Sequence, residues 1–248
     1  MKKIKDNFSS QADDYAAYRP RYPEELYRFI LSLTPDCNSA LDVATGNGQV
    51  AVELAKYFDT VAAIDISEKQ LAKSIAIENI NYSVSRAELL NFDSHSFELI
   101  AVGQAAHWFD LEKFYAEAKR VLVPGGVLAL FGYTLPVIDP AVDAAILKLY
   151  EEILGPYWDS ERKIVDSGYK DLWFPFGKIS HPEFKIELEW NYNQLIGYLG
   201  TWSAVQHYKN KNSTDPLRIV KEEIRSVWGN LDEKKITFPV FLLVTKIT

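Results

Sequence analysis

The chain has 248 residues, of which 48% are hydrophobic, and a formal net charge of −7. This length and composition allow one large hydrophobic core, so we expect a single domain. The acidic balance argues against a general nucleic-acid surface, which needs a basic face to displace phosphate counterions. The longest apolar run, residues 238–244, has the length of a buried strand and falls short of a membrane span of about 18 residues. We therefore expect neither a nucleic-acid nor a membrane partner.

The cysteine content and the first residues suggest a location. Cys37 is the single cysteine, so no disulfide forms within this sequence, which fits a reducing compartment. The first fifteen residues carry lysines but no apolar segment of the kind found in secretory signals. A cytoplasmic protein, monomeric or weakly dimeric, is the simplest expectation.

The first half of the chain alternates apolar strands with amphipathic helices. Strands are predicted at residues 39–43, 60–65, 81–85, 97–102 and 127–131, and helices at residues 8–33, 49–58, from 67 and 110–122. Ser67 and Gln70 have the spacing of a helix capping box. Such alternation predicts βαβ units, a mostly parallel sheet with helices on both faces, and ligands at the C-terminal ends of the strands.

After residue 132 the pattern changes to aromatic-rich helices and loops, which we interpret as a cap over the sheet. Strands are predicted at residues 183–192 and 235–247, with helices between them. Pro239 in the last strand favours an edge or a bulge. We accordingly divide one domain into an N-terminal helical cap (1–34), a cofactor-binding core (35–132), a cap insertion (133–183) and a C-terminal part that completes the sheet (184–248).

Residues 40–55 are predicted as a strand, a glycine turn and the start of a helix. Gly46, Gly48 and Ala51 fit the dinucleotide fingerprint, but Asp42 lies just upstream in the strand. Beside the pyrophosphate of a dinucleotide this carboxylate would be a like charge, which is unfavourable in a partly dry site. Beside the ammonium and sulfonium of S-adenosylmethionine it is a counter-charge, so the charge favours S-adenosylmethionine. Alternatively, Asp42 is a structural acid of the turn. Asp65, at the end of the second strand, suits a ribose of either ligand.

Four stretches are similar to class I S-adenosylmethionine-dependent methyltransferases, over roughly residues 8–132. "LDVATGNG" (41–48) resembles the first motif, with Ala44 where glycine is commonest, and "AIDIS" (63–67) resembles the ribose-binding segment. The stretch that begins "RAELL" (86–90) is similar to the adenine-reading segment, with Arg86 in place of the common aspartate, and "AKRVLVPGGVLAL" (118–130) resembles the fifth β unit.

The resemblance implies a fold, a cofactor and a set of contacts. The fold is a Rossmann-like seven-stranded, mostly parallel sheet with helices on both faces, an antiparallel last strand and a helical cap. The cofactor is S-adenosyl-L-methionine. The expected cofactor-binding residues are Asp42, Ala44, Thr45, Gly46, Gly48, Asp65, Ile66, Ala87, Glu88, Gln104 and Arg19.

Five further stretches, residues 8–23, 103–110, 157–169, 172–176 and 198–208, resemble the trans-aconitate methyltransferase-like group. That group includes enzymes that esterify small carboxylates, so O-methylation of a small-molecule carboxylate is our leading hypothesis. A small amine or a lipid or isoprenoid acceptor is the alternative. A non-catalytic S-adenosylmethionine-binding module and an NAD-dependent oxidoreductase are less favoured.

The side chains needed to bind and activate the methyl acceptor depend on the charge and protonation state of that acceptor. His107, after the fourth strand, is the candidate base, although a carboxylate is already ionised at pH 7 and His107 would then bind it. An anionic acceptor needs a cation, for which Arg19 is the first choice, followed by Arg21, Arg162 and Lys163. The expected substrate-binding residues are Tyr15, Tyr22, Trp108, Tyr133 and Trp202. The histidines lack ligand-like spacing, so no metal is expected. Alternatively, His107 and Trp108 simply pack against the following helix.

Overall fold

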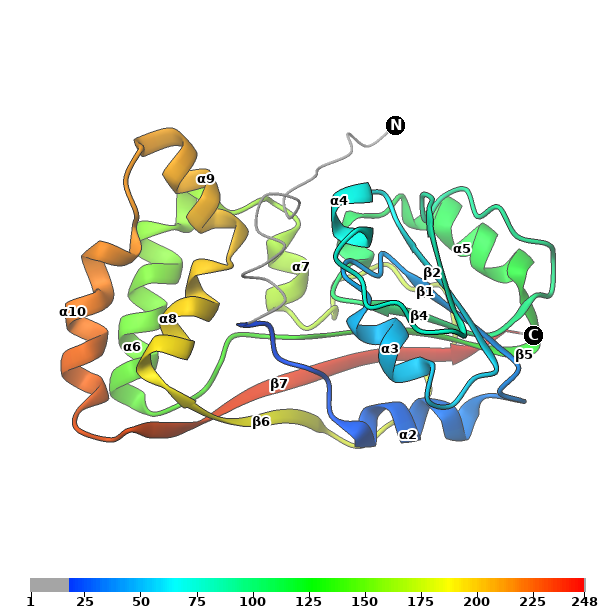
Figure 1. Ribbon diagram of the computed structural model, residues 1–248, viewed down its shortest axis with the longest axis horizontal. Helices are drawn as coiled ribbons and strands as arrows, with labels where there is room; N and C mark the ends of the chain where they lie inside the picture. Colours follow the sequence, from blue (N-terminus) through cyan, green and yellow to red (C-terminus); the bar gives the residue numbers. More distant parts are fainter. Residues whose placement is uncertain (1–17, 248) are drawn as a thin grey trace.

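In the computed structural model, which describes residues 18–247, seven strands form one sheet in the order β3-β2-β1-β4-β5-β7-β6. The strands are β1 (Ser39–Val43), β2 (Thr60–Asp65), β3 (Ile80–Val84), β4 (Phe97–Gly103), β5 (Leu122–Tyr133), β6 (Phe184–Asn191) and β7 (Glu233–Lys246). β7 is antiparallel to both of its neighbours, and the other neighbouring pairs are parallel. The predicted Rossmann-like sheet with an antiparallel last strand is therefore confirmed (Figure 1).

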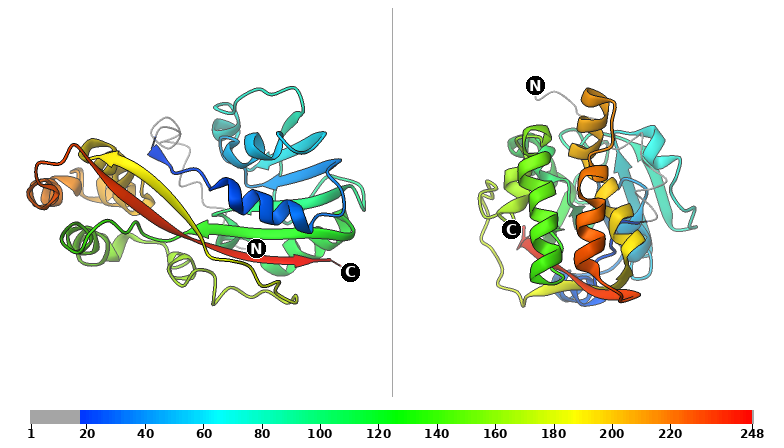
Figure 2. Two further views of the ribbon diagram at one scale, coloured as in Figure 1. Left: turned by 90° about the horizontal axis from the view of Figure 1, so that it is seen from below. Right: turned by 90° about the vertical axis from the view of Figure 1, so that its left-hand side faces the viewer.

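Helices connect the strands and cover both faces of the sheet (Figures 1 and 2). The helical elements are α2 (Glu24–Leu33), α3 (Gln49–Leu54), α4 (Glu68–Leu71), the 3₁₀ turn η2 (Ala106–Trp108), α5 (Leu111–Val121), α6 (Pro140–Leu147), the π-helical η3 (Lys148–Ile153), the 3₁₀ turn η4 (Gly155–Tyr157), α7 (Arg162–Asp166), α8 (Tyr192–Gly200), α9 (Ser203–Asn212) and α10 (Leu217–Trp228).

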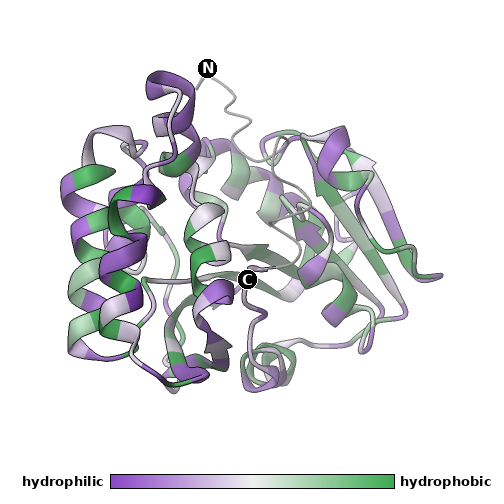
Figure 3. Cartoon of the chain, turned by 60° about the vertical axis from the view of Figure 1, so that its left-hand side comes forward, coloured by the Kyte–Doolittle hydropathy of each residue, from purple (hydrophilic) through white to green (hydrophobic). Residues whose placement is uncertain are grey.

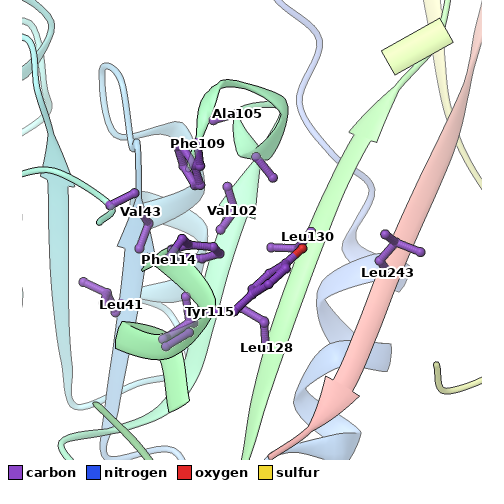
Figure 4. Packing of buried hydrophobic residues seen from close by; sticks show 14 of the residues in the cluster. Leu41, Val43, Val102, Ala105, Phe109, Phe114, Tyr115, Leu128, Leu130 and Leu243 are labelled. Atoms are coloured by element: carbon purple, nitrogen blue, oxygen red, sulfur yellow. The ribbon is translucent and has the colours of Figure 1, made fainter. Parts of the chain in front are cut away.

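Alternation along the central strands places buried side chains on two opposite faces of the sheet, because successive residues of a strand point to opposite sides. Leu41 of β1 and Leu128 of β5 belong to the cluster that contains Phe114 of α5, and Figure 4 shows these side chains converging. Their neighbours, such as Ala40 and Val127, belong to the cluster under α2 and α3. These two layers fix the sheet and leave its C-terminal strand ends for the connecting loops.

A separate helical layer lies over the extended ends of β6 and β7 (Figure 1). In α10 the buried residues Leu217, Val220, Ile224 and Trp228 recur at helical spacing, so one face of the helix packs inward. Helices α6 and α10 lie side by side at this end (Figure 2), and hydrophobic and hydrophilic residues alternate along the helices (Figure 3). Both the predicted cap insertion and the C-terminal part contribute helices to this layer. The division of the domain into four segments stays a prediction.

Two local expectations differ from the structure. Of residues 18–23, predicted as helix, only Tyr18 is helical, because Pro20 and Pro23 disfavour helical conformation in the residues before them. The first ten residues of that predicted helix, 8–17, lie outside the described range. The capping box at Ser67 forms only in part: its hydroxyl accepts the N–H of Gln70, whereas its own N–H donates to Asp65.

The position of Pro239 is the third difference. β7 lies between β5 and β6, and its register with β6 runs without interruption through Pro239, so the expectation of an edge or a bulge was wrong. Pro239 pairs with Lys185 of β6, and on its other side the carbonyl accepts the N–H of Thr134, one residue past the end of β5. The N–H and C=O groups of one residue point to the same neighbouring strand in an antiparallel pair. The proline has no N–H to donate toward β5, but β5 ends at Tyr133, so no strand partner for that group is present at this position.

Candidate cofactor and substrate site

A cavity opens at the C-terminal ends of β1, β2, β3 and β4, as expected for a parallel sheet. The predicted site residues that line it are Arg19, Ala44, Gly46, Asp65, Ile66, Ala87, Glu88, Gln104, His107, Trp108 and Trp202. Asp42, Thr45, Gly48, Tyr22 and Tyr133 do not line it, and Tyr15 lies outside the described residues. Most of the predicted set thus meets in one place, although the ligand contacts themselves stay predictions.

The glycine turn between β1 and α3 needs three residues in the left-handed region. Ala44 has φ +58°, Gly46 φ +59° and Gly48 φ +88°. A Cβ on Gly48 would collide with the Tyr82 side chain, so that position accepts only glycine without a shift of the tyrosine. Ala44 adopts a conformation that costs a residue with a Cβ about 1–2 kcal/mol. This strain explains why glycine suits the position of Ala44.

Asp65 ties the glycine turn to the turn that follows β2. Its carboxylate accepts the N–H of Gly46 at 2.9 Å and the N–H of Ser67 at 2.8 Å. The side chain comes from the last residue of β2, and it is mostly buried at the cavity wall. Each carboxylate oxygen has a second lone pair, so the same group can also accept hydroxyls of a ribose.

Asp42 lies beneath the turn rather than in the cavity. Its carboxylate is 1% exposed and accepts a hydrogen bond from the Thr45 hydroxyl. Burial raises its pKa from 3.8 to about 7, and the neighbouring charge of Asp65 adds to the rise, against the hydrogen bond from Thr45. This position fits the structural role that the sequence left open, and the predicted contact of Asp42 with the cofactor stays a prediction.

The segment after β4 places a histidine at the cavity. His107 lies in η2 and is 6% exposed, with its Nδ1 2.9 Å from the hydroxyl of Tyr169. Gln104, with φ +53°, does more than line the cavity: its side chain accepts the N–H of Tyr133 and donates to the carbonyl of the same residue. These two hydrogen bonds join the ends of β4 and β5 and so fix the position of the chain just before η2.

The predicted adenine-reading segment also lines the cavity. Arg86 Nε lies 3.3 Å from Glu88 Oε2, and Glu88 Oε1 accepts the N–H of Asp110 at the start of α5. Glu88 is thus held between a neighbouring arginine and a helix terminus, while Ser85 and Ala87 contribute smaller groups to the same wall. The arginine that replaces the common aspartate lies at the cavity, as the alignment of the motif implies.

Two arginines lie on the side of the cavity that faces the cap. Arg19 donates to the hydroxyl of Tyr133 at 3.1 Å and to the carbonyl of Thr201 at 3.1 Å. Tyr133 therefore acts on the cavity by holding Arg19. Arg162 Nε donates to the hydroxyl of Tyr150 at 2.8 Å and to Asp166 at 2.9 Å. Its guanidinium lies over the rings of Tyr150 and Trp158.

The cap supplies lining residues that the sequence reasoning did not include in the predicted site. They are Trp158, Asp159, Glu161, Arg162, Val165 and Ser203. From sequence, Arg162 follows Arg19 as a candidate cation, and the stretch 157–169 stands out only by its resemblance to the family. A run of charged residues in an irregular segment gives no periodicity that shows which side chains face inward, so the packing of α7 was needed to select them.

Residues 18–247 contain neither a metal-binding cluster nor a membrane-spanning helix. Within that range no three histidine, cysteine, aspartate or glutamate side chains gather in a way that could hold a metal ion. No helix of the same range combines the length and the apolar character that crossing a membrane requires.

The sheet order, the glycine turn and the acid at the end of β2 together define a class I S-adenosylmethionine-dependent methyltransferase fold and cofactor site. A methyltransferase-domain family model matches residues 41–130. A Dictyostelium discoideum protein described as a "Putative methyltransferase" is 34% identical, covering 98% of this chain and 96% of its own length. The methyltransferase pgmE of Aspergillus terreus is 30% identical over 65% of this chain but only 53% of its own length.

Solved structures agree with these relatives. A "Putative Type II Methyltransferase" from Anaeromyxobacter dehalogenans has a TM-score of 0.85 and 37% identity, covering 93% of this chain and 98% of that one. The chain belongs to the class I methyltransferase family, and S-adenosylmethionine is its cofactor. The alternative of an NAD-dependent oxidoreductase is therefore not supported.

Proposed function

We propose that this methyltransferase transfers the methyl group of S-adenosylmethionine to a carboxylate of a small molecule. The observation that carries the proposal is the state of Arg162. Its side chain lines the cavity, and within residues 18–247 its two terminal guanidinium nitrogens form no hydrogen bond, since Tyr150 and Asp166 both accept from Nε. The two terminal nitrogens of a guanidinium match the two oxygens of a carboxylate.

The surroundings hold this guanidinium in place before a ligand arrives. It lies 5.0 Å from the ring centroid of Trp158 and 5.3 Å from that of Tyr150. Stacking of this kind reduces the rotamer entropy lost on binding, so more of the interaction energy remains for the ligand. Trp158 and Trp202, whose rings are 5.6 Å apart, suit an acceptor with an apolar part beside the carboxylate.

Methyl transfer to a carboxylate needs few further catalytic groups from the protein. Methyl transfer from a sulfonium is an in-line displacement in which a carboxylate oxygen attacks the methyl carbon and the sulfonium leaves as a neutral thioether. A carboxylate has a reference pKa of about 4, so it attacks without a base. Alignment of donor and acceptor can supply on the order of 7–11 kcal/mol of the barrier reduction.

A second acceptor class is supported by a different observation. Asp159 and Glu161 line the same side of the cavity, and the carboxylate of Asp159 lies 4.0 Å from His207 Nδ1. These acids would favour a cationic acceptor, so N-methylation of a small amine is the competing proposal. Each class predicts a different product, which separates them.

The test is transfer of labelled methyl from S-adenosylmethionine to a panel of small carboxylic acids and a matched panel of amines. Methyl esters release labelled methanol when treated with base, whereas N-methyl products keep the label. We expect base-labile label with the acids. Base-stable label with the amines and none with the acids would overturn the carboxylate proposal and favour the amine.

A further inference from the structure

The hydroxyl of Tyr150 lies between the cavity-lining arginine of α7 and the acid that pairs with that arginine. Arg162 Nε donates to the Tyr150 oxygen at 2.8 Å and to Asp166 Oδ1 at 2.9 Å. The same hydroxyl lies 2.7 Å from Oδ1 and 2.8 Å from Oδ2 of Asp166. The three side chains thus form one closed hydrogen-bonded group beside the cavity.

The chemistry of the three groups fixes the direction of each hydrogen bond. A guanidinium can only donate, and an ionised carboxylate can only accept. The phenolic oxygen of Tyr150 therefore accepts from Arg162 with a lone pair. Its single proton points to Asp166, where the two carboxylate oxygens share it. Both oxygens of the acid are thus engaged by the hydroxyl.

This arrangement changes how the acid and the arginine pair. Asp166 lies four positions after Arg162, a spacing at which oppositely charged side chains on a helix meet. An arginine and a carboxylate often form two parallel hydrogen bonds, one to each oxygen. Here Asp166 Oδ2 accepts from the Tyr150 hydroxyl and from no nitrogen of Arg162. The acid therefore binds Nε alone, and the two terminal nitrogens of the guanidinium are left to the cavity.

Local structure holds Tyr150 in this place. The residue lies in η3, whose wide turn is closed by the N–H of Leu154 and the carbonyl of Leu149, and π-helical turns are frequent at functional sites. Trp158 Nε1 donates to the Tyr150 carbonyl at 3.0 Å, and the guanidinium lies over both rings. Tyr150 is 8% exposed, so little water can compete for its hydroxyl.

We infer that Tyr150 is a positioning residue that occupies the second oxygen of Asp166, so that Arg162 presents two terminal nitrogens to the acceptor instead of one. This inference deepens the proposed function and rests on it for the nature of the acceptor. Without the hydroxyl, Asp166 Oδ2 is free to accept from a terminal nitrogen of Arg162. A carboxylate ligand would then lose one prong of its two-pronged partner.

The pairing can be tested without any acceptor, in crystal structures of the full chain bound to S-adenosylhomocysteine. Tyr150→Phe keeps the ring under the guanidinium and removes only the hydroxyl. We expect Asp166 Oδ2 to lie within hydrogen-bond distance of a terminal nitrogen of Arg162 in this variant, but not in the wild type. Pairing through Nε alone in both proteins would overturn the inference.

Kinetics measures the consequence, with the carboxylic acid of the panel that gives the most base-labile label. Tyr150→Phe should raise the KM for this acid roughly tenfold, the size of one hydrogen bond, while kcat and the affinity for S-adenosylhomocysteine stay close to those of the wild type. Adding Asp166→Asn should bring the KM back, because the asparagine no longer competes as a charge for Arg162. A purely structural role predicts the opposite, since the double variant loses more contacts. A KM that the second substitution leaves high or raises further would contradict the inference.

Tyr157→Phe is the matched control. The Tyr157 hydroxyl accepts from the side-chain amide of Asn212 at 2.8 Å, and the residue does not line the cavity. This variant removes a tyrosine hydroxyl from the neighbouring turn, so it should leave the KM unchanged. Equal increases of the KM in Tyr157→Phe and Tyr150→Phe would show a general loosening of the cap and would contradict a specific role of Tyr150.

The two proposals fail separately. If only amines are methylated, the acceptor assignment falls, and the crystal structures still show whether Tyr150 controls the pairing of Asp166. If acids are methylated but Tyr150→Phe changes neither that pairing nor the KM, the function stands and the role of Tyr150 falls.

Discussion

The buried carboxylate of Asp42 accepts a hydrogen bond from the hydroxyl of Thr45 beneath the glycine turn. Burial raises the pKa of Asp42 from 3.8 to about 7. The folded chain therefore binds this proton more tightly than the unfolded chain does. Consequently the free energy of unfolding should fall as pH rises from about 4 to 7, by an amount on the order of 4 kcal/mol. The loss stops once the pH exceeds the folded pKa.

Asp42→Asn removes that loss, because the asparagine oxygen can still accept from Thr45 and carries no charge. We expect the variant to be more stable than the wild type at pH 8 and to lose the advantage near pH 4. Urea unfolding of the cofactor-free protein at several pH values measures this. Asp59→Asn, at an exposed position, is the matched control and should leave the pH dependence unchanged. An Asp42→Asn profile parallel to the wild type would contradict the assignment.

The same carboxylate should link cofactor binding to proton release. With a pKa of about 7, Asp42 is roughly half protonated at neutral pH, and a nearby ammonium and sulfonium would favour its charged form. We expect a fraction of a proton to leave when S-adenosylmethionine binds at pH 7. Calorimetry in two buffers with different ionisation enthalpies measures that fraction, and Asp42→Asn should abolish it. The same release in both proteins would place the cationic end of the cofactor away from Asp42.

The strained alanine of the glycine turn gives another prediction. Ala44 has φ +58°, a conformation that glycine adopts at no steric cost. Ala44→Gly should relieve about 1–2 kcal/mol of strain and lose about 0.4–1 kcal/mol to the freer unfolded chain. We expect a net gain of about 0.5–1 kcal/mol in thermal or urea unfolding, with cofactor affinity equal or higher.

Gly46→Ala is the matched opposite change. The position has φ +59°, and no atom would lie within 4 Å of the new Cβ, so the cost is conformational rather than a collision. It should destabilise by about 1 kcal/mol. If Ala44→Gly destabilised the protein as much as Gly46→Ala does, the left-handed conformation of Ala44 could not be correct.

The cofactor side of the site could be predicted from sequence because its residues are tied to strand ends. Asp65 ends β2, Ala87 follows β3 and Gln104 follows β4, and a parallel sheet brings such ends to one edge. Two-residue periodicity reveals the strands, and glycines mark the turn. The local sequence pattern is therefore enough to predict the parallel strands and the edge of the sheet at which the cavity opens.

The acceptor side could not be predicted in the same way, because its contacts join distant parts of the chain. Arg19 and Tyr133 are 114 positions apart, and His107 and Tyr169 are 62 apart. One sequence contains no signal for such pairs. Likewise, Asp42 is predicted as a cofactor-binding residue, and a short strand does not reveal that its side chain is buried away from the lining of the cavity.

The last prediction concerns the cation that the proposed function depends on. Arg162→Gln removes a charged donor pair from the cavity, and hydrogen bonds to charged groups contribute about 1.5–3 kcal/mol. We therefore expect the KM for a carboxylic acid acceptor to rise about ten- to a hundredfold, while kcat and the affinity for S-adenosylhomocysteine stay close to those of the wild type. Arg162→Lys should recover only part of the loss, because an ammonium lacks the two-pronged geometry.

Lys163→Gln is the matched control, since the neighbouring side chain is exposed and does not line the cavity. It removes the same charge from the same helix, so it should leave the KM unchanged while altering the long-range field equally. Thermal unfolding of both variants checks that α7 stays folded, because Arg162 also packs on Tyr150 and Trp158. If both substitutions raised the KM alike, the effect would be one of general charge, and Arg162 would not be the group that binds the acceptor.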